Sequence, residues 1–244
     1  MVDTRNNPAI SAVVPVKNEA DNILPLVTEI DAALRQTEGG YEIVYVDDGS
    51  SDATPARLKD VQAAFPVLRI VTHSSSCGQS AAIATGVRYA RGRLIVTLDG
   101  DGQNVPADIP AMMAHIGGAD DLMVAGRRTT RQDVAIKRLT SRLANKIRAT
   151  LLRDDTPDTG CGLKVFPRAA FLQLPYFDHM HRFLPALMQR QGYRVIHHDV
   201  HHRPRAFGRS KYGTLDRLFV SLFDMAGVMW LQRRMSKPDH IQAD

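Results

Sequence analysis

The central motif of the chain reads LIVTLDGDGQ at residues 94–103. Its first half is apolar and rich in β-branched residues, which predicts a short buried strand. Directly after that strand, Asp99 and Asp101 stand one residue apart, where a hard divalent cation could take oxygen ligands. Gly100 and Gly102 leave room for a bulky ligand to approach the backbone. The motif predicts a site for a metal ion and a substrate diphosphate; the alternative is a polar turn with a solvated acidic pair.

Two earlier strands end in similar polar clusters. The apolar run at residues 10–16 leads into Pro15-Val16-Lys17-Asn18-Glu19, and the run at residues 41–46 leads into Asp47-Asp48-Gly49-Ser50. In an open α/β sheet, ligands bind just outside the carboxyl ends of the strands. Polar groups at three such ends indicate recognition of a nucleotide base and ribose beside the metal.

Strand and helix patterns alternate along the chain, which predicts one α/β domain with a mostly parallel sheet flanked by helices. We expect strands near residues 10–16, 41–46, 68–71, 94–98, 122–125, 163–166 and 194–200. We expect helices near residues 23–34, 53–65, 78–90, 109–116, 136–152 and 183–191, of which the range 136–152 is basic. The catalytic domain should span residues 9–213, with a helix at 214–235 and flexible ends at 1–8 and 236–244.

Composition agrees with such a domain. The 244 residues, of which 44% are hydrophobic, suffice for one sizeable core. Only two cysteines are present, Cys77 and Cys161, which argues against a disulfide scaffold and fits a reducing compartment. No charged segment followed by an apolar one opens the chain, so we expect no signal peptide and a cytoplasmic location.

The motifs taken together resemble a known family. The first half carries Pro15-Val16-Lys17-Asn18-Glu19, Asp47-Asp48-Gly49-Ser50 and Asp99-Gly100-Asp101-Gly102-Gln103 in that order. This series resembles the family 2 glycosyltransferases with the GT-A fold. The second half carries GRR at residues 126–128, DTGCGLK at 158–164, HRFLP at 181–185 and RPRAFGRSKY at 203–212. These segments resemble the polyprenyl-phosphate sugar synthases of the dolichol-phosphate mannosyltransferase type.

The resemblance implies an inverting transfer of a sugar from a nucleoside-diphosphate donor, linked to GDP or UDP, to a polyprenyl phosphate. It implies Mg²⁺ or Mn²⁺ as cofactor, with Asp99, Asp101 and Gln103 at the metal. The residues expected to act in catalysis are Asp99, Asp101, Arg128 and Arg205. Those expected at the donor nucleotide are Pro15, Lys17, Glu19, Asp47, Asp48 and Asp99. Those expected at the acceptor phosphate are Arg128, His181, Arg205, Arg209, Ser210 and Lys211.

Charge supports a phosphorylated acceptor. The chain carries a net charge of +5, and basic residues gather at 127–142 and at 203–211. Such clusters can bind nucleic acid, anionic lipid or a phosphorylated substrate, but the chain shows no nucleic-acid-binding fold and no aromatic stacking platform. A phosphate monoester has a second pKa of about 6, so it arrives ionised and needs cations rather than a strong base.

A histidine-rich segment offers a rival site. If residues 194–200 form a strand, His197, Asp199 and His201 share one face and could hold zinc. We favour instead a polar sheet edge that leads into the basic loop.

The C-terminal segment suggests contact with a membrane. Residues 218–231 are mostly apolar, but spanning a bilayer takes about 20 such residues, and Asp224 interrupts the run. Arg217, Arg233 and Arg234 flank the run, and Trp230 lies near one end of it, which suits a helix lying in the headgroup region. The alternative is a helix that closes the core. We therefore expect a peripheral enzyme at the cytoplasmic face of a membrane.

Two other functions remain open at this point. One is a family 2 transferase that glycosylates a carbohydrate hydroxyl, which would need a positioned base. The other is a nucleotide-sugar-binding regulator without turnover.

Overall fold

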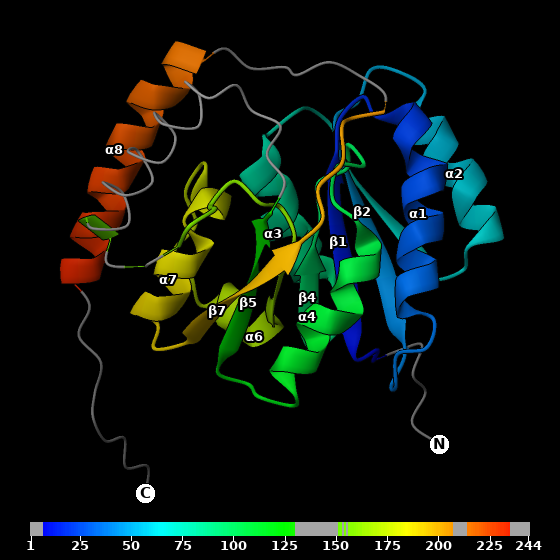
Figure 1. The fold of residues 1–244 in the computed structure, drawn as a ribbon. Coiled ribbons are helices and arrows are strands. Elements are labelled where there is room, and N and C mark those ends of the chain that lie inside the picture. Colours follow the sequence, from blue (N-terminus) through cyan, green and yellow to red (C-terminus); the bar gives the residue numbers. More distant parts are fainter. Residues whose placement is uncertain (1–6, 130–150, 153, 155, 207–213, 235–244) are drawn as a thin grey trace, which may run out of the picture.

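The computed structural model describes residues 7–129, 151–152, 154, 156–206 and 214–234. Its centre is a seven-stranded sheet in the order β3-β2-β1-β4-β6-β5-β7 (Figure 1). The strands are β1 (Ile10–Val16), β2 (Tyr41–Asp48), β3 (Leu68–His73), β4 (Leu94–Thr97), β5 (Leu122–Arg128), β6 (Lys164–Pro167) and β7 (Arg194–Val200).

Only one of these strands runs against the others. β1 pairs in parallel with β2 and β4, β2 with β3, and β5 with β7. β6 is antiparallel to both β4 and β5. The amino end of β6 therefore lies at the same edge of the sheet as the carboxyl ends of the other strands, including β4 with its acidic motif.

Helices cover both faces of the sheet (Figure 1). The α-helices are α1 (Ala20–Leu34), α2 (Thr54–Ala64), α3 (Gln79–Tyr89), α4 (Ile109–Ile116), α6 (Arg168–Leu172), α7 (Leu184–Arg190) and α8 (Thr214–Arg233). Single 3-10 turns lie at Pro106–Asp108 and Met180–Arg182. One apolar layer joins α1, α2 and α4 to the sheet, and a second joins α3, α6 and α7 to its other face.

Local sequence accounts for these layers. All seven residues of β1 are buried because helices cover both of its faces, which is typical of a parallel strand. In α1 the buried apolar positions Ile23, Leu26, Val27, Ile30 and Leu34 follow the helical period and face the sheet.

The predicted α/β architecture is confirmed, and every expected strand is present. The antiparallel direction of β6 was not predicted. The expected basic helix at 136–152 lies outside the described residues, apart from its end at 151–152. Of the expected flexible ends at 1–8 and 236–244, only residues 7 and 8 are described.

The helix expected at 214–235 is present as α8, which packs beside α7 (Figure 1). Val228 is buried there, and Arg190 Nε donates to the Leu231 carbonyl at 2.9 Å. Within the described parts of the chain, no helix is long and apolar enough to cross a membrane.

Candidate active site

The acidic pair after β4 lies at the carboxyl edge of the sheet. Gln79, in the first turn of α3, donates to Asp99 Oδ1 at 2.8 Å, and the Asn104 side chain accepts from the Asp99 backbone at 2.9 Å. Asp101 Oδ1 accepts from the Gln103 backbone at 3.1 Å, and Asp101 Oδ2 receives Arg205 at 2.5 Å. The carboxylates expected at the metal are thus fixed by neighbouring groups from three separate segments.

Burial and like charge act together on Asp99. Desolvation and the neighbouring carboxylate of Asp101 raise its pKa from 3.8 to about 6. Lys164, Gln79 and Arg128 oppose that shift because each favours the ionised form. Two carboxylates that resist joint ionisation are a suitable pair for a divalent cation, which would neutralise them.

This shift predicts how cation binding depends on pH. Below about pH 6, Asp99 holds a proton that a cation must displace, so the apparent affinity for Mn²⁺ should fall towards tenfold per pH unit. The raised pKa also means that ionisation of Asp99 disfavours the metal-free folded state as pH rises from about 4 through 6. Titration of Mn²⁺ binding by calorimetry between about pH 5 and pH 7 measures the first effect, and an affinity constant over this range would contradict it.

The segment before β6 closes one side of the acidic pair. A Cβ on Gly162 would lie 2.4 Å from the Asp99 carboxylate, so this chain passes directly against it and only glycine fits. The Gly162 carbonyl accepts from Thr97 Oγ1 at 2.8 Å, which ties the segment to β4.

Lys164, the first residue of β6, is a functional candidate that the sequence reasoning missed. Its side chain is buried and donates to the Cys161 carbonyl, and desolvation lowers its pKa. Its charge also favours the ionised form of Asp99. Lys164 ends the quoted motif at residues 158–164, but no role was predicted for it.

Arg128 lies at the end of β5 and is held by Asp158. The guanidinium donates from Nε to Asp158 Oδ2 and from Nη2 to Asp158 Oδ1, both at 2.7 Å. A Cβ on Gly160 would come within 2.9 Å of the same guanidinium. Paired hydrogen bonds fix the plane of an arginine, so Arg128 is oriented before any ligand arrives. Asp158 was part of a quoted motif, but no role was predicted for it.

The loop after β1 is fastened to the loop after β2. Asn18 adopts a left-handed backbone conformation, and its amide donates to Ser50 Oγ at 2.9 Å. The Glu19 amide donates to Thr54 Oγ1 at 2.9 Å. Pro15 lies against the acidic motif, because a Cβ on Gly100 would meet its carbonyl at 2.8 Å. The expected donor residues Pro15, Lys17 and Glu19 therefore lie beside the carboxyl ends of β2 and β4.

Asp47 lies at the carboxyl end of β2, beside the loop that follows β1. Its side chain is almost fully buried, and Oδ1 accepts from the Ser50 amide at 3.0 Å. This position stays compatible with the predicted contact to the donor base or ribose.

We expect Asp47→Ala to weaken binding of a nucleoside diphosphate roughly tenfold or more, because a hydrogen bond to a charged group contributes about 1.5–3 kcal/mol. Calorimetric titration of GDP and UDP measures this effect. Exposed Asp120 supplies the control, since Asp120→Ala should leave the affinity as it is. An unchanged affinity in Asp47→Ala would refute the assignment.

Asp48, the next residue, makes four hydrogen-bond contacts of its own. Its Oδ1 accepts from the Cys77 amide and contacts His73 Nδ1, both at 2.8 Å. Its Oδ2 accepts from Ser76 Oγ at 2.7 Å and from the Gly78 amide at 2.9 Å. These contacts fill the acceptor positions of the carboxylate, and hydrogen bonds from the loop and His73 hold its pKa below the usual range against the opposing effect of burial. In the structure Asp48 holds the loop that precedes α3, and its expected contact to the donor stays a prediction.

His181 lies in the 3-10 turn at Met180–Arg182 and contacts α3. Its Nδ1 lies 2.7 Å from Ser80 Oγ, and burial lowers its pKa to about 3, so the imidazole is neutral at physiological pH. The expected acceptor residues Arg209, Ser210 and Lys211 lie outside the described part of the chain.

A clamp formed by Arg203 and Glu29 holds the segment that carries Arg205. Arg203 donates to both carboxylate oxygens of Glu29 on α1, at 3.0 and 2.9 Å, and to the Gly102 carbonyl at 2.5 Å. The Arg203 amide donates to the Gln103 carbonyl at 3.1 Å. The segment after β7 is thus bound both to the acidic motif and to α1, which places Arg205 against Asp101. Glu29 was not singled out from the sequence because it lies on an ordinary helical face.

The rival zinc site on β7 does not form among the described residues. Asp199 pairs with Arg127 at 2.5 Å, and His201 Nδ1 lies 2.8 Å from Asp108 Oδ1. Of the residues described, only Asp48, His73 and Cys77 bring three ligand atoms of the His, Cys or carboxylate type within 4.8 Å of one another.

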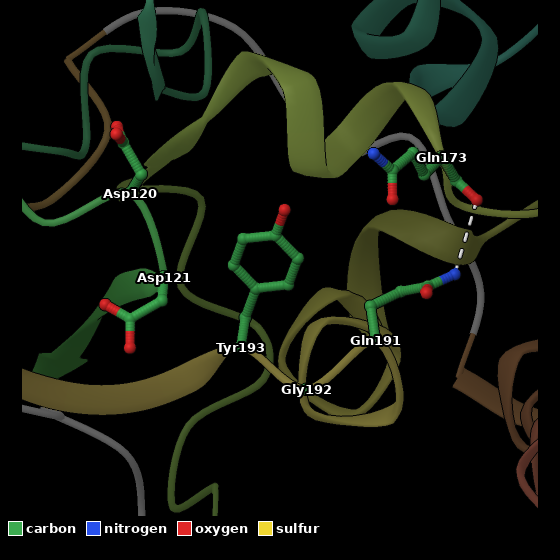
Figure 2. A pocket seen from close by; sticks show the side chains of 6 residues that line it. All are labelled: Asp120, Asp121, Gln173, Gln191, Gly192 and Tyr193. Atoms are coloured by element: carbon green, nitrogen blue, oxygen red, sulfur yellow. Dashed lines mark hydrogen bonds between the residues drawn. The ribbon is translucent and has the colours of Figure 1, made fainter. Parts of the chain in front are cut away.

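A depression of about 370 Å³ lies at the other edge of the sheet, beside the amino ends of β5 and β7 (Figure 2). Figure 2 shows the Tyr193 ring between Asp121 on one side and Gln191 on the other. Asp121 is paired with Arg194 at 2.9 Å. None of the candidate site residues lines this depression, so it is separate from the candidate active site.

Known proteins match this chain in sequence and in fold. The model of the family described as glycosyl transferase family 2 matches residues 11–174. A dodecaprenyl-phosphate galacturonate synthase of Rhizobium johnstonii is 36% identical over 235 residues, which cover 95% of this chain and 69% of that protein. An undecaprenyl-phosphate 4-deoxy-4-formamido-L-arabinose transferase of an Enterobacter species is 34% identical over 88% of this chain and 66% of its own length. The chain thus spans about two thirds of these relatives.

Solved structures share the fold at lower identity. A mannosyltransferase of Pyrobaculum calidifontis in complex with GDP-Man and Mn²⁺ superposes with a TM-score of 0.67 at 20% identity, covering 97% of this chain and 67% of the other. A glucosyl-3-phosphoglycerate synthase of Mycobacterium tuberculosis with Mn²⁺, UDP-glucose and phosphoglyceric acid gives a TM-score of 0.68 at 16% identity, covering 96% of this chain and 82% of the other.

Proposed function

The chain belongs to glycosyl transferase family 2 and has the GT-A fold, and from this premise we propose that it transfers a sugar from a nucleoside diphosphate to a polyprenyl phosphate. The proposal rests most directly on one arrangement. The acidic pair Asp99 and Asp101 shares an edge of the sheet with two oriented arginines, Arg128 and Arg205. The curated relatives named above act on polyprenyl phosphates, which supports the same acceptor class here.

The donor would lie at the carboxyl ends of β1, β2 and β4. Asp47 would accept hydrogen bonds from the base or ribose, and the loop from Pro15 to Glu19 would pack against them. The donor set of Asp99 and Asp101 fits Mg²⁺ or Mn²⁺, because both ions prefer oxygen ligands and the raised pKa of Asp99 marks a site that gains from added positive charge. When bound, such an ion would neutralise charge that develops on the leaving diphosphate.

The chain's own residues would do the rest of the work. Two hydrogen bonds to Asp158 fix the plane of the Arg128 guanidinium. Its remaining N–H groups can fork onto phosphate oxygens of the acceptor or the donor. Arg205, which lies beside Asp101, can also fork onto phosphate oxygens. Two anionic substrates repel each other, so cations on both sides are needed to bring the acceptor oxygen up to the sugar carbon. Attack on the face opposite the leaving group inverts that carbon, and an ionised phosphate needs no strong base. The absence of a strong base agrees with His181, because its imidazole is neutral, has a lowered pKa and is bonded to Ser80.

The acceptor provides the decisive experiment. A short polyprenyl phosphate should accept the sugar, whereas the matching unphosphorylated polyprenol should not, under identical donor and Mn²⁺ concentrations. A panel of GDP- and UDP-linked sugars would be screened first to find the donor. Equal transfer to both lipids would overturn the proposal in favour of a hydroxyl acceptor.

The helix α8 would bring the enzyme to the lipid. Its inner side packs on α7, while Leu222, Phe223 and Trp230 are exposed, with Phe223 at 79% and Trp230 at 60%. Exposed aromatic and aliphatic groups on one side of a helix, with Arg233 and Arg234 at its end, suit the headgroup region of an anionic membrane. The site would then face acceptors held in that membrane.

We expect the double substitution of Phe223→Asp and Trp230→Asp to reduce binding to anionic liposomes about tenfold or more, because each removes apolar surface and adds a negative charge. Flotation with vesicles of phosphatidylglycerol measures the effect. Tyr89→Asp, at an exposed site on α3, is the matched control and should bind like the unchanged protein. Equal flotation of all three proteins would rule out α8 as the membrane contact. Point substitutions are preferred to deletion because Val228 of the same helix is buried.

A further inference from the structure

Three side chains of different chemistry meet at the ends of β2 and β3, outside the acidic pair. Asp48 is the last residue of β2, and His73, the last residue of β3, is its partner in the register. Cys77 lies in the loop that leads from β3 to α3, and its side chain is exposed. A carboxylate oxygen, an imidazole nitrogen and the thiol sulfur of these residues all lie within 4.8 Å of one another.

The surrounding contacts hold two of these groups in fixed orientations. The Asp48 carboxylate receives Ser76 Oγ at 2.7 Å and the backbone amides of Cys77 and Gly78 at 2.8 and 2.9 Å. The His73 ring contacts Asp48 through Nδ1 at 2.8 Å and Thr85 Oγ1 through Nε2 at 3.0 Å. A hydrogen bond to the far nitrogen of an imidazole is the usual support of a metal-binding histidine.

We propose that Asp48, His73 and Cys77 form a binding site for a thiophilic divalent cation of the Zn²⁺ class. An imidazole, a thiolate and a carboxylate are the ligands that zinc takes in proteins, whereas Mg²⁺ and Mn²⁺ prefer oxygen alone. The site is therefore chemically distinct from the pair Asp99 and Asp101. Exposure of Cys77 leaves a fourth coordination position open to water.

Binding requires a defined rearrangement of protons. In the metal-free protein the hydrogen bond to the Asp48 carboxylate requires a proton on Nδ1 of His73. On cation binding that proton would leave to solvent and Nε2 would carry the one ring proton and donate to Thr85 Oγ1, which leaves the Nδ1 lone pair for the cation. The contact between Nδ1 and Asp48 Oδ1 is replaced by two bonds to the ion. The Cys77 thiol releases its proton to solvent and binds as thiolate, so binding strengthens as pH rises. The exposed Cys77 side chain moves the remaining distance to the ion. The hydrogen bonds of Asp48 with Ser76 Oγ and with the amides of Cys77 and Gly78 stay in place.

Occupation of the site would stiffen the entrance to α3. The loop at residues 74–78 lies between His73 and Gln79, and Gln79 donates to Asp99 at 2.8 Å. A cation that joins β2, β3 and this loop would hold Gln79 in position beside the acidic pair. The site is thus placed to couple thiophilic metal binding to the candidate active site without sharing a ligand with it.

Cobalt provides the test, because a thiolate bound to Co²⁺ gives a charge-transfer absorption in the near ultraviolet that oxygen ligands do not. The full chain is titrated with Co²⁺ under reducing conditions in excess Mg²⁺, which occupies oxygen-only sites. We expect the absorption in the unchanged protein and its loss on addition of Zn²⁺. Cys77→Ser should abolish it, whereas Cys161→Ser, which removes the other cysteine, should keep it. Thr85→Val should weaken Co²⁺ binding roughly tenfold, as loss of a supporting hydrogen bond does at other metal sites.

Several results would overturn the proposal. Absence of the absorption in the unchanged protein would do so, as would its persistence in Cys77→Ser. Asp101→Asn should leave the absorption intact, and its disappearance in that variant would contradict the claim that this site binds its ion independently of the acidic pair. Because these readouts do not use sugar transfer, failure of the proposed reaction would not affect them.

Discussion

An Asp101→Asn variant should lose on the order of a thousandfold or more in transfer rate while its fold and melting temperature are retained. The asparagine keeps the size of the side chain but removes the charge that a divalent cation needs, and a cation at the leaving diphosphate contributes several kcal/mol to the transition state. The substitution also removes the charge partner of Arg205, which lies 2.5 Å from Asp101 Oδ2.

The comparison is made with Asp120→Asn, an identical change at an exposed carboxylate that lies far from the site. Turnover is measured with saturating donor in the presence and absence of a chelator, and circular dichroism reports the fold. Chelation should reduce the unchanged protein to the level of the variant. Full activity in excess chelator would remove the metal from the proposed mechanism.

Replacement of Arg205 by alanine should produce the second largest loss, on the order of a hundredfold in transfer rate, with little change in affinity for the nucleoside diphosphate alone. A fixed donor aimed at developing charge is typically worth that much in an enclosed site. Arg205→Lys should recover only part of the rate, since lysine supplies the charge but cannot fork onto two oxygens.

Arg35→Ala, at an exposed arginine of α1, serves as the control and should turn over normally. Single-turnover rates are set against calorimetric affinities for GDP and UDP. A variant whose nucleotide affinity falls as far as its rate would show that Arg205 binds the donor rather than the transition state. A variant with unchanged rate would exclude it from the reaction.

The strands and the acidic edge could be predicted from the sequence because they are written in local patterns. Buried runs such as residues 10–16 and 94–97 are mostly apolar, and polar residues follow them where the chain leaves the sheet. The direction of β6 could not be predicted, because a run of four residues carries no mark of which neighbour it joins. Its reversal is what brings Gly162 and Lys164 to the acidic pair.

The contacts that set individual roles also lay beyond the sequence. Asp47 and Asp48 are adjacent and identical in type, yet only the fold shows that loop residues 76–78 occupy the second carboxylate. Arg203 and Glu29 lie 174 positions apart and meet only because the segment after β7 crosses the carboxyl edge of the sheet to α1. Such pairings depend on how layers are stacked, which residue periodicity does not record.

The clamp between Arg203 and Glu29 has a consequence for protein engineering. It fixes the chain just before residue 206 to the half of the molecule that would bind the nucleotide, through the two hydrogen bonds from Arg203 to Glu29 on α1. Whatever sequence follows is therefore attached at a point whose position does not depend on that sequence. Residues 207–213 could then be exchanged between relatives with Arg203 and Glu29 retained. Such an exchange would vary the proposed acceptor-binding residues while the proposed donor-binding residues keep their positions.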